Sequence, residues 1–243
     1  RIYDRTGENL LYDVIDPRAG DRIWMGIEDV PVQFVQATIA IEDKTFYENP
    51  GYDLEGILRA FLSNVQGGAI QGGSTITQQL IKNVIISPNQ LAELSYRRKL
   101  QEILIAIEAT KRYGKHQILE WYLNTNFYGN MAYGVDAAAR VYFGKSAAEL
   151  DLSEISLLAA IPQFPALNPL DAPLKAKQRQ ELVLTTMQDQ GYISALQAQD
   201  AARIDVISRV QAAPKRFTVK APHFTFYALR EVLSMLDSQV VFR

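Results

Sequence analysis

The stretch Gly72–Asn83, GGSTITQQLIKN, constrains the fold of this chain more than any other. Thr75 and Gln78 have the spacing of a capping box, in which each side chain satisfies a backbone amide at the other's position. This spacing predicts a helix that begins immediately after Thr75. The face that this helix would pack against a core consists of apolar residues at four-residue steps, Ile76, Leu80 and Val84.

The other side of the same predicted helix is polar and ends in a cation. It carries Thr75, Gln78, Gln79 and Lys82, and it follows a glycine turn that includes Gly73. Free amides at a helix N-terminus, together with a forward lysine, suit an anion and most plausibly a phosphate. On spacing alone, an ordinary capped helix with a solvated polar face is the commoner arrangement.

Nearly all of the chain after Pro31 has helical patterning, so the sequence predicts a mainly α protein. Pro31 suits the first position of a helix that places Glu42–Asp43 near its end. The expected core-facing residues of that helix are Val32, Val35 and Ile39.

A second long helix is predicted over Leu91–Tyr113, with Arg98 and Glu102 on the side away from the core. Alternation within Arg1–Trp24 predicts one or two short strands or extended arms. The expected core stripe of the long helix is Leu100, Ile103, Leu104 and Ile107.

Composition narrows the function classes. The 243 residues include no cysteine and two histidines, which excludes a disulfide framework, a thiolate metal site and a cysteine nucleophile, and argues against a multi-histidine metal centre. The formal net charge of −2 gives no general reason to expect nucleic-acid binding. No run is apolar enough to span a bilayer, and the chain reads as a piece of a longer protein whose membrane anchor lies elsewhere.

Charged residues are informative only in combination. Glu42 and Asp43 lie at the C-terminal end of a predicted helix, where the helix macrodipole disfavours a negative charge. This can raise the pKa of a carboxyl group, as a general base requires. Such an acidic pair is, however, more often a solvated helix terminus. Glu102 near Arg97 and Lys99 has an equally plain interpretation as surface ion pairs. Two separated glutamates, an anion site and a cationic cluster together suit glycosyl transfer from a diphosphate donor.

Several blocks of the sequence resemble the signature motifs of a known family. In order they are EDKTFYENPGYDLEGILRA, GGSTITQQLIKN, RRKLQEILIAIEATKRYGKHQILEWYLNTNFYGN, AYGVDAAARVYFGK and LLAAIPQFPALNP. They are similar to the motifs of peptidoglycan glycosyltransferases of family 51, the transglycosylase domains of class A penicillin-binding proteins. The resemblance implies a lysozyme-like helical fold with a small membrane-proximal lobe, covering residues 1–213. Residues 214–243 resemble a connector toward an absent transpeptidase domain.

The resemblance also implies a reaction and a site. Such enzymes polymerise lipid II into glycan strands with inversion, and undecaprenyl diphosphate is the leaving group. The catalytic residues would be Glu42, as general base, and Glu102; Lys82, Arg98 and Lys99 would stabilise the diphosphate. The full substrate-binding set implied by the matched motifs is Asp43, Phe46, Asn49, Gly73, Ser74, Thr75, Gln79, Lys82, Asn83, Arg98 and Lys99.

The expected partners are lipid II, the growing glycan strand, the membrane surface, moenomycin-type inhibitors and the transpeptidase domain, with no nucleic acid. The expected location is the extracytoplasmic face of a bacterial cell membrane. No cofactor is required by the motifs, although a divalent cation, Mg²⁺ or Mn²⁺, could assist at the diphosphate.

Two positions depart from the family pattern. Asn49 stands where histidine is common, and Leu94 where a basic residue is often found, which bears on donor affinity. Two alternatives stay open: a glycan-cleaving hydrolase with the same fold, which the two glutamates would suit, and a non-catalytic scaffold that binds lipid diphosphates, which these two departures would allow. The apolar stretch Gly56–Val65 and the glycine-rich Gly67–Gly73 fit either a lip on the membrane or a buried helix followed by a loop.

Overall fold

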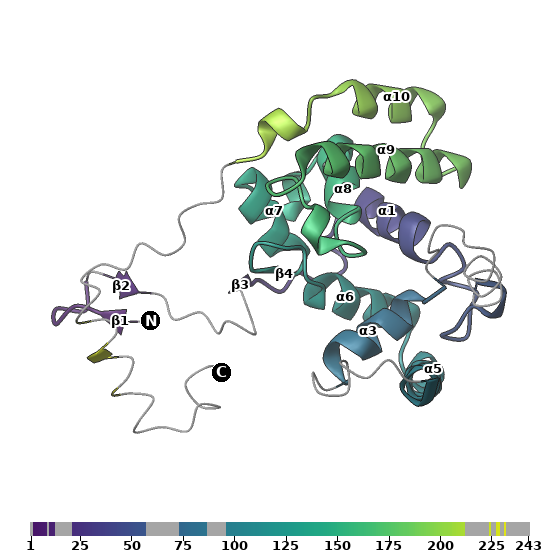
Figure 1. The fold of residues 1–243 in the computed structure, drawn as a ribbon, viewed down its shortest axis with the longest axis horizontal. Helices are drawn as coiled ribbons and strands as arrows, with labels where there is room; N and C mark the ends of the chain where they lie inside the picture. Colours follow the sequence, from purple (N-terminus) through teal and green to yellow (C-terminus); the bar gives the residue numbers. More distant parts are fainter. Residues whose placement is uncertain are drawn as a thin grey trace. The chain divides into compact units, whose positions relative to one another are not determined.

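The computed structural model describes residues 2–8, 10–12, 21–56, 73–86 and 96–211, and the single positions 224, 227, 228 and 231. The chain divides into two compact units, one of Arg22–Ala212 and one that joins Arg1–Asp21 with Ala213–Arg243 (Figure 1). Within the smaller unit, β1 (Ile2–Tyr3) and β2 (Leu10–Tyr12) pair antiparallel, with Ile2 opposite Tyr12. The predicted short strands are thus present, and the predicted division after residue 213 stays a prediction.

The larger unit is mainly helical, as predicted. The second sheet within the described residues pairs β4 (Ala132–Tyr133) with β3 (Asp21–Arg22), the strand at which the larger unit begins. Its α-helices are α1 (Val32–Glu42), α3 (Ile76–Val84), α5 (Tyr96–Arg112), α6 (Lys115–Thr125), α7 (Val135–Phe143), α8 (Leu152–Ala159), α9 (Pro173–Asp189) and α10 (Ala195–Arg203). Short 3₁₀ turns occur at η1 (Ala147–Glu149), η2 (Pro165–Leu167) and η3 (Ile207–Arg209).

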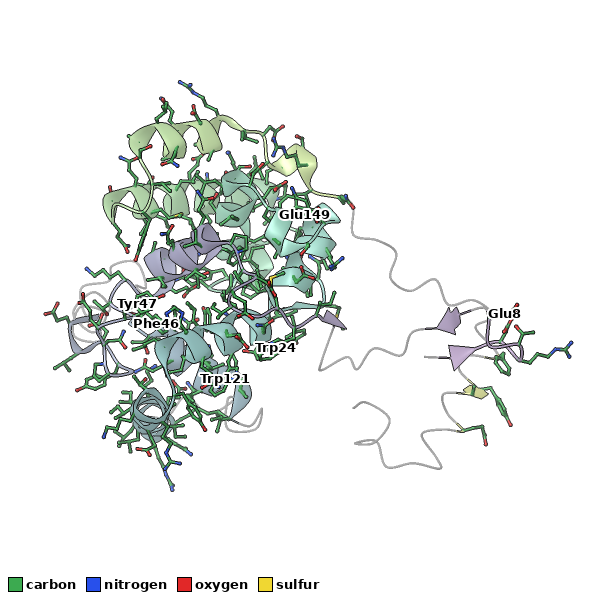
Figure 2. All side chains as sticks on the ribbon, turned by 180° about the vertical axis from the view of Figure 1, so that it is seen from behind. Glu8, Trp24, Phe46, Tyr47, Trp121 and Glu149 are labelled. Carbon is green, nitrogen blue, oxygen red and sulfur yellow. The ribbon has the colours of Figure 1, made fainter. Side chains whose placement is uncertain are left out.

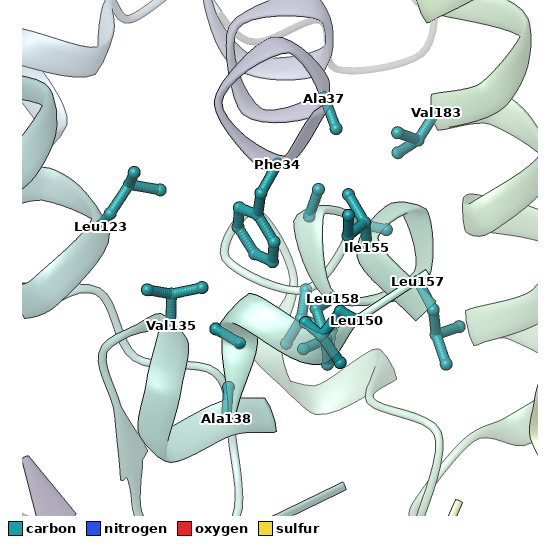
Figure 3. Packing of buried hydrophobic residues seen from close by; sticks show 14 of the residues in the cluster. Phe34, Ala37, Leu123, Val135, Ala138, Leu150, Ile155, Leu157, Leu158 and Val183 are labelled. Atoms are coloured by element: carbon teal, nitrogen blue, oxygen red, sulfur yellow. The ribbon is translucent and has the colours of Figure 1, made fainter. Parts of the chain in front are cut away.

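The helices pack as two groups, joined by α7, by the core around Phe34 and by the contact between Glu42 at the end of α1 and Gln79 of α3. In one group α1 lies against α8 and α9, and α9 also carries α10; in the other α3 lies against α5 and α6 (Figure 1). The core around Phe34 joins α1 to side chains from α6, α7, α8 and α9 (Figure 3). Burying a phenylalanine of this kind contributes about 1.5–3 kcal/mol, so this cluster anchors α1 and fixes where its C-terminal residues lie.

The predicted start of α3 is confirmed. Thr75 is its N-cap, and Thr75 and Gln78 form the complete capping box. Ile76 and Leu80 are buried as expected, but Val84 is 58% exposed, so its assignment to the core was wrong. Val84 is the last residue of the helix and lines an open apolar groove between α3, α5 and α6.

The face prediction for α5 was also wrong. Leu100 and Leu104 are each 58% exposed, whereas Glu102 and Ala106 are buried. Helix α5 packs against its neighbours through Glu102 and Ala106. The Glu102 carboxylate can be buried there because it forms ion pairs with Arg98 and Lys99. Ile103 and Ile107 of the predicted stripe are partly buried, so the prediction was wrong for the two leucines and for Glu102, because apolar periodicity cannot register such pairing.

Helix α1 shows a smaller error of the same kind. Ile39 is buried and Val35 is partly buried, but Val32 is 67% exposed, and the covered face is centred on Phe34, Ala37 and Thr38.

None of the helices in the described part of the chain is long and apolar enough to cross a bilayer. The expectations for Gly56–Val65 and Gly67–Gly73 lie outside the described residues except at Gly56 and Gly73, and Leu94 lies outside them too.

Candidate active site

Glu42 is the last residue of α1 and reaches toward α3. Its Oε2 accepts a hydrogen bond of 2.8 Å from Nε2 of Gln79, while its Oε1 is buried and has no hydrogen-bond partner among the described residues. Burial raises the pKa of the Glu42 carboxyl, and this effect outweighs the Gln79 hydrogen bond and the charges of Arg179 and Lys82, which lower it. The carboxylate therefore keeps one unoccupied oxygen and an enhanced affinity for a proton.

The carboxylate of the next residue, Asp43, is engaged in hydrogen bonds within the protein. Its carboxylate accepts hydrogen bonds from Nδ2 of Asn49 at 2.9 and 3.1 Å and from the backbone N–H of Ile76 at 3.0 Å. An anion at the first amide of α3 interacts favourably with the helix N-terminus. Burial raises the pKa of Asp43 while these hydrogen bonds lower it. Asp43 consequently ties the segment after α1 to the start of α3.

Asn49 and Phe46 belong to the same buried support. Nζ of Lys115 donates to the backbone oxygen of Asn49 at 2.6 Å and lies 4.8 Å from the centre of the Phe46 ring. Phe46 is fully buried and stacks edge-on against Tyr47, and both are labelled in Figure 2. Asn49 and Phe46 thus belong to the buried contacts that support the turn after α1 and do not line the pocket. Their substrate-binding role stays a prediction, as does the effect of having Asn49 where histidine is expected.

Gly51 allows that support to form. It has φ of +104°, and an added Cβ would lie 2.5 Å from the backbone oxygen of Ala106 on α5. A glycine is needed for both reasons, because other residues rarely adopt this φ and the two backbones approach too closely for a side chain. The turn at residues 49–51 is therefore where the first motif packs on the third.

The second predicted glutamate lies within a cationic cluster. Nζ of Lys99 is 3.1 Å from Oε2 of Glu102 and 2.8 Å from Oγ of Ser74, and Nε of Arg98 is 3.3 Å from Oε1 of Glu102. Glu102 is buried, whereas Arg98 and Lys99 are partly exposed. The buried carboxylate holds both cations at the surface of α5, beside the start of α3.

A pocket of about 210 Å³ joins several of the predicted residues. Ser74 connects the Glu42 carboxylate to the cationic cluster on α5, because it lines the pocket together with Glu42 and also accepts a hydrogen bond from Lys99. Asn83 is placed differently, with its Nδ2 2.9 Å from Oδ1 of Asn126. The pocket is lined by Ala40, Ile41, Glu42, Asp43, Lys44, Asp53, Gly56, Gly73, Ser74, Thr75, Thr186 and Gln190.

Sequence reasoning missed four residues around the base. Thr186 and Gln190 line the pocket from α9, Arg179 of the same helix acts on the charge of Glu42, and Tyr122 of α6 hydrogen-bonds Gln79. The signal for Tyr122 was its place within the third motif. The α9 residues had none, since α9 lies well over a hundred residues beyond α1 in sequence and only packing brings the two together.

A second, apolar groove of about 780 Å³ lies between α3, α5 and α6. Its walls include Val84 and Ile85 of the α3 end, Leu104 of α5 and the two tryptophans Trp24 and Trp121, which are labelled in Figure 2. Leu104 of the expected core stripe therefore lines a surface groove. No group of three or more His, Asp or Glu side chains that could hold a metal ion occurs among the described residues.

Comparisons with known proteins give a consistent result. A family model described as Transglycosylase matches residues 8–188. Penicillin-binding protein 1A of Rickettsia typhi is 38% identical over all of this chain and 30% of its own length. Penicillin-binding protein 1A of Aquifex aeolicus is 43% identical over 82% of this chain and 27% of its own length. The chain thus spans about a third or less of these relatives.

A solved structure agrees with the sequence matches. The crystal structure of penicillin-binding protein 1A from Haemophilus influenzae superposes with a TM-score of 0.54 at 25% identity, covering 90% of this chain and 22% of that chain. The observed helical architecture is thus the fold of that protein's matching region.

Proposed function

Since the chain belongs to the transglycosylase family found in class A penicillin-binding proteins, we propose that it polymerises lipid II into peptidoglycan glycan strands. The reaction would be an inverting glycosyl transfer with undecaprenyl diphosphate as leaving group. The observation that best supports this proposal is the unoccupied, buried Oε1 of Glu42, in a carboxyl that lines a pocket and whose pKa is raised.

Glu42 would act as the general base. Its Oε1 takes the proton from the 4-hydroxyl of the acceptor sugar as that oxygen forms a bond to the anomeric carbon of the donor. The bond between this carbon and the diphosphate oxygen breaks in the same displacement, and the electron pair leaves with the diphosphate. One displacement inverts the anomeric centre, so no covalent glycosyl-enzyme is formed.

The cations would stabilise the departing diphosphate. Arg98 and Lys99 are held by Glu102, and Lys82 lies close enough to Glu42 to lower its pKa. Charge-assisted hydrogen bonds strengthen as negative charge develops on the leaving group, so these residues act mainly in the transition state. Moenomycin-type inhibitors, which carry a phosphate, would occupy the same cations.

A divalent cation at the diphosphate would have to be held largely by the diphosphate oxygens themselves. The described residues hold no cluster of acidic or histidine ligands, and the oxygens of Asp43 are occupied by Asn49 and by the backbone of Ile76. We therefore assign no step to a metal.

The decisive experiment is polymerisation of labelled lipid II by the wild-type chain and by Glu42→Gln. The variant keeps the shape of the side chain and an oxygen that can accept from Gln79 but removes the base, so we expect its rate to fall by roughly 10²–10⁴-fold. Glu181→Gln, at an exposed carboxyl on α9 that lines neither the pocket nor the groove, is the matched control and should retain wild-type activity.

The same assay separates the alternatives. Cleavage of preformed glycan without polymer formation would identify a hydrolase, and binding of lipid II without turnover would identify a scaffold. Undiminished polymerisation by Glu42→Gln would refute the assignment of the base.

We also propose that the apolar groove faces the membrane that supplies the substrate. Val84, Ile85 and Leu104 are exposed apolar side chains around it, and lipid II is anchored in the bilayer by its polyprenyl chain. This orientation fits the extracytoplasmic face of a bacterial cell membrane. In the full-length protein, a transpeptidase domain would use the glycan strands made here.

A further inference from the structure

Three side chains from three different helices form a directed chain of hydrogen bonds that ends at Glu42. The hydroxyl of Tyr122 on α6 donates to Oε1 of Gln79 on α3 over 3.1 Å. Nε2 of Gln79 then donates to Oε2 of Glu42 at the end of α1 over 2.8 Å. Tyr122 is fully buried, so its hydroxyl is shielded from water as an alternative partner.

We propose that Tyr122 is a positioning residue for the base: its hydroxyl holds the Gln79 amide with the NH₂ group toward Glu42, and so keeps that carboxylate ionised and aimed at the pocket. The inference rests on the proposed function for its catalytic meaning. Tyr122 itself touches neither Glu42 nor the pocket in the hydrogen bonds observed, and it acts through Gln79.

The chemistry of the amide explains why it needs to be held. A glutamine side chain presents a donor at one end and an acceptor at the other, and the two ends have nearly the same shape. With the oxygen turned toward Glu42, the amide would repel the carboxylate. With the oxygen engaged by the tyrosine O–H, the amide N–H faces Glu42 and is polarised toward it.

Other charges around Glu42 do not replace this contact. Arg179 from α9 and Lys82 from α3 favour the ionised carboxylate, whereas Asp43 and burial oppose it. Burial also raises the pKa of Tyr122 well above its ordinary value, and the charge of Glu42 raises it further. The pKa of Tyr128, the other buried phenol near Glu42, is raised by the same two causes, burial and the charge of Glu42. Both phenols therefore stay protonated at working pH, and Tyr122 remains a donor.

The test is the Tyr122→Phe variant, with the titration of Glu42 as readout. The ¹³C resonance of the Glu42 carboxyl is assigned by its disappearance in Glu42→Gln and followed against pH. Loss of the hydroxyl frees the Gln79 amide and weakens a charge-assisted bond, so the midpoint should rise by about one pH unit. The acid limb of the lipid II polymerisation rate should move upward by the same amount, and the rate should recover at higher pH.

The matched control is Tyr142→Phe. Tyr142 is also a buried phenol, but its hydroxyl donates to the backbone oxygen of Tyr128 at 2.6 Å and accepts from Asn130. Its loss should lower the unfolding temperature without moving the titration of Glu42, which separates a specific effect from general loosening of the core.

Gln79→Leu keeps the proposal testable even if Tyr122→Phe does not fold. It should raise the Glu42 midpoint at least as much, and the double variant should show no further rise, because Tyr122 acts through Gln79. A midpoint unchanged in Gln79→Leu, or effects that add in the double variant, would overturn the proposal. The titration needs no turnover, so a wild-type chain that makes no polymer would refute the proposed function without affecting this result.

Discussion

At the scale of single residues, the carboxyl of Glu42 is subject to opposing influences. Burial raises its pKa, and the Gln79 hydrogen bond and the charges of Arg179 and Lys82 lower it without cancelling the effect of burial. Ionisation of the Glu42 carboxyl therefore lowers the stability of the folded protein, although the proposed reaction requires the ionised form. Function and stability are therefore expected to oppose each other at this residue.

This opposition predicts how stability depends on pH. Because the folded pKa of Glu42 lies above the unfolded value, its contribution to stability is complete below the unfolded pKa and is lost as pH rises through the folded pKa. Glu42→Gln removes that loss, and we expect it to unfold at higher denaturant concentration than wild type at pH 7. The gain is about 1.4 kcal/mol for each unit by which the folded pKa exceeds the unfolded one.

Urea unfolding at pH 4 and pH 7 checks this prediction. The gain should be nearly absent at pH 4, where Glu42 is largely protonated in both states. Equal stabilisation at the two pH values would contradict the assigned cause.

At the scale of elements, α3 carries the contacts that assemble the site. Its capping residue Thr75 accepts from the N–H of Gln78 and also donates to the backbone oxygen of Gly51 at 2.8 Å. The Thr75 hydroxyl thus caps the start of α3 and also connects the second sequence motif to the turn of the first motif at Gly51. On the polar side of α3 predicted from the sequence, Thr75 and Gln78 are buried, Gln79 is partly buried and Lys82 is exposed.

Thr75→Ala should show this double role. It loses a cap worth about 1 kcal/mol and leaves a buried carbonyl without its donor, so we expect a total loss of roughly 2–3 kcal/mol in unfolding free energy. Ser194→Ala is the matched control, because Ser194 and Gln197 form a capping box at the exposed start of α10. It should cost about 1 kcal/mol or less, and polymerisation should fall only in Thr75→Ala. Equal losses would show that the contact to Gly51 contributes little.

At the scale of the whole molecule, the larger unit presents two different surfaces around α3. The pocket at its N-terminal end is polar and charged, and the groove along its other side, between α5 and α6, is apolar. A substrate with a charged diphosphate between a sugar and a hydrocarbon chain has the same division, which is why we propose that both surfaces serve one substrate at a membrane.

Membrane attachment through the groove can be tested with vesicles of phosphatidylglycerol and phosphatidylethanolamine. Replacing both Val84 and Ile85 by Asp should weaken co-sedimentation roughly ten- to a hundredfold, because the apolar area of two side chains is lost from the contact. Leu174→Asp is the control, since Leu174 is 81% exposed on α9 and lies outside the groove. Equal weakening by the control would argue against a specific membrane-facing groove.

Local features were predictable from the sequence because their causes are local. The capping box at Thr75, the end of α1 at Glu42 and the helical class follow from side chains that act on their own backbone within a few residues. The family motifs further assigned roles to Glu42, Glu102 and the cations, and these roles remain predictions to be tested by substitution.

Only the tertiary structure decided which faces are buried and what surrounds the base. Apolar periodicity placed Leu104 in the core and Glu102 outside it, whereas ion pairing reverses that order on α5. Tyr122 and Arg179 reach Gln79 and Glu42 from helices distant in sequence. Their influence on one carboxyl depends on distance through space, and a linear pattern contains no measure of that distance.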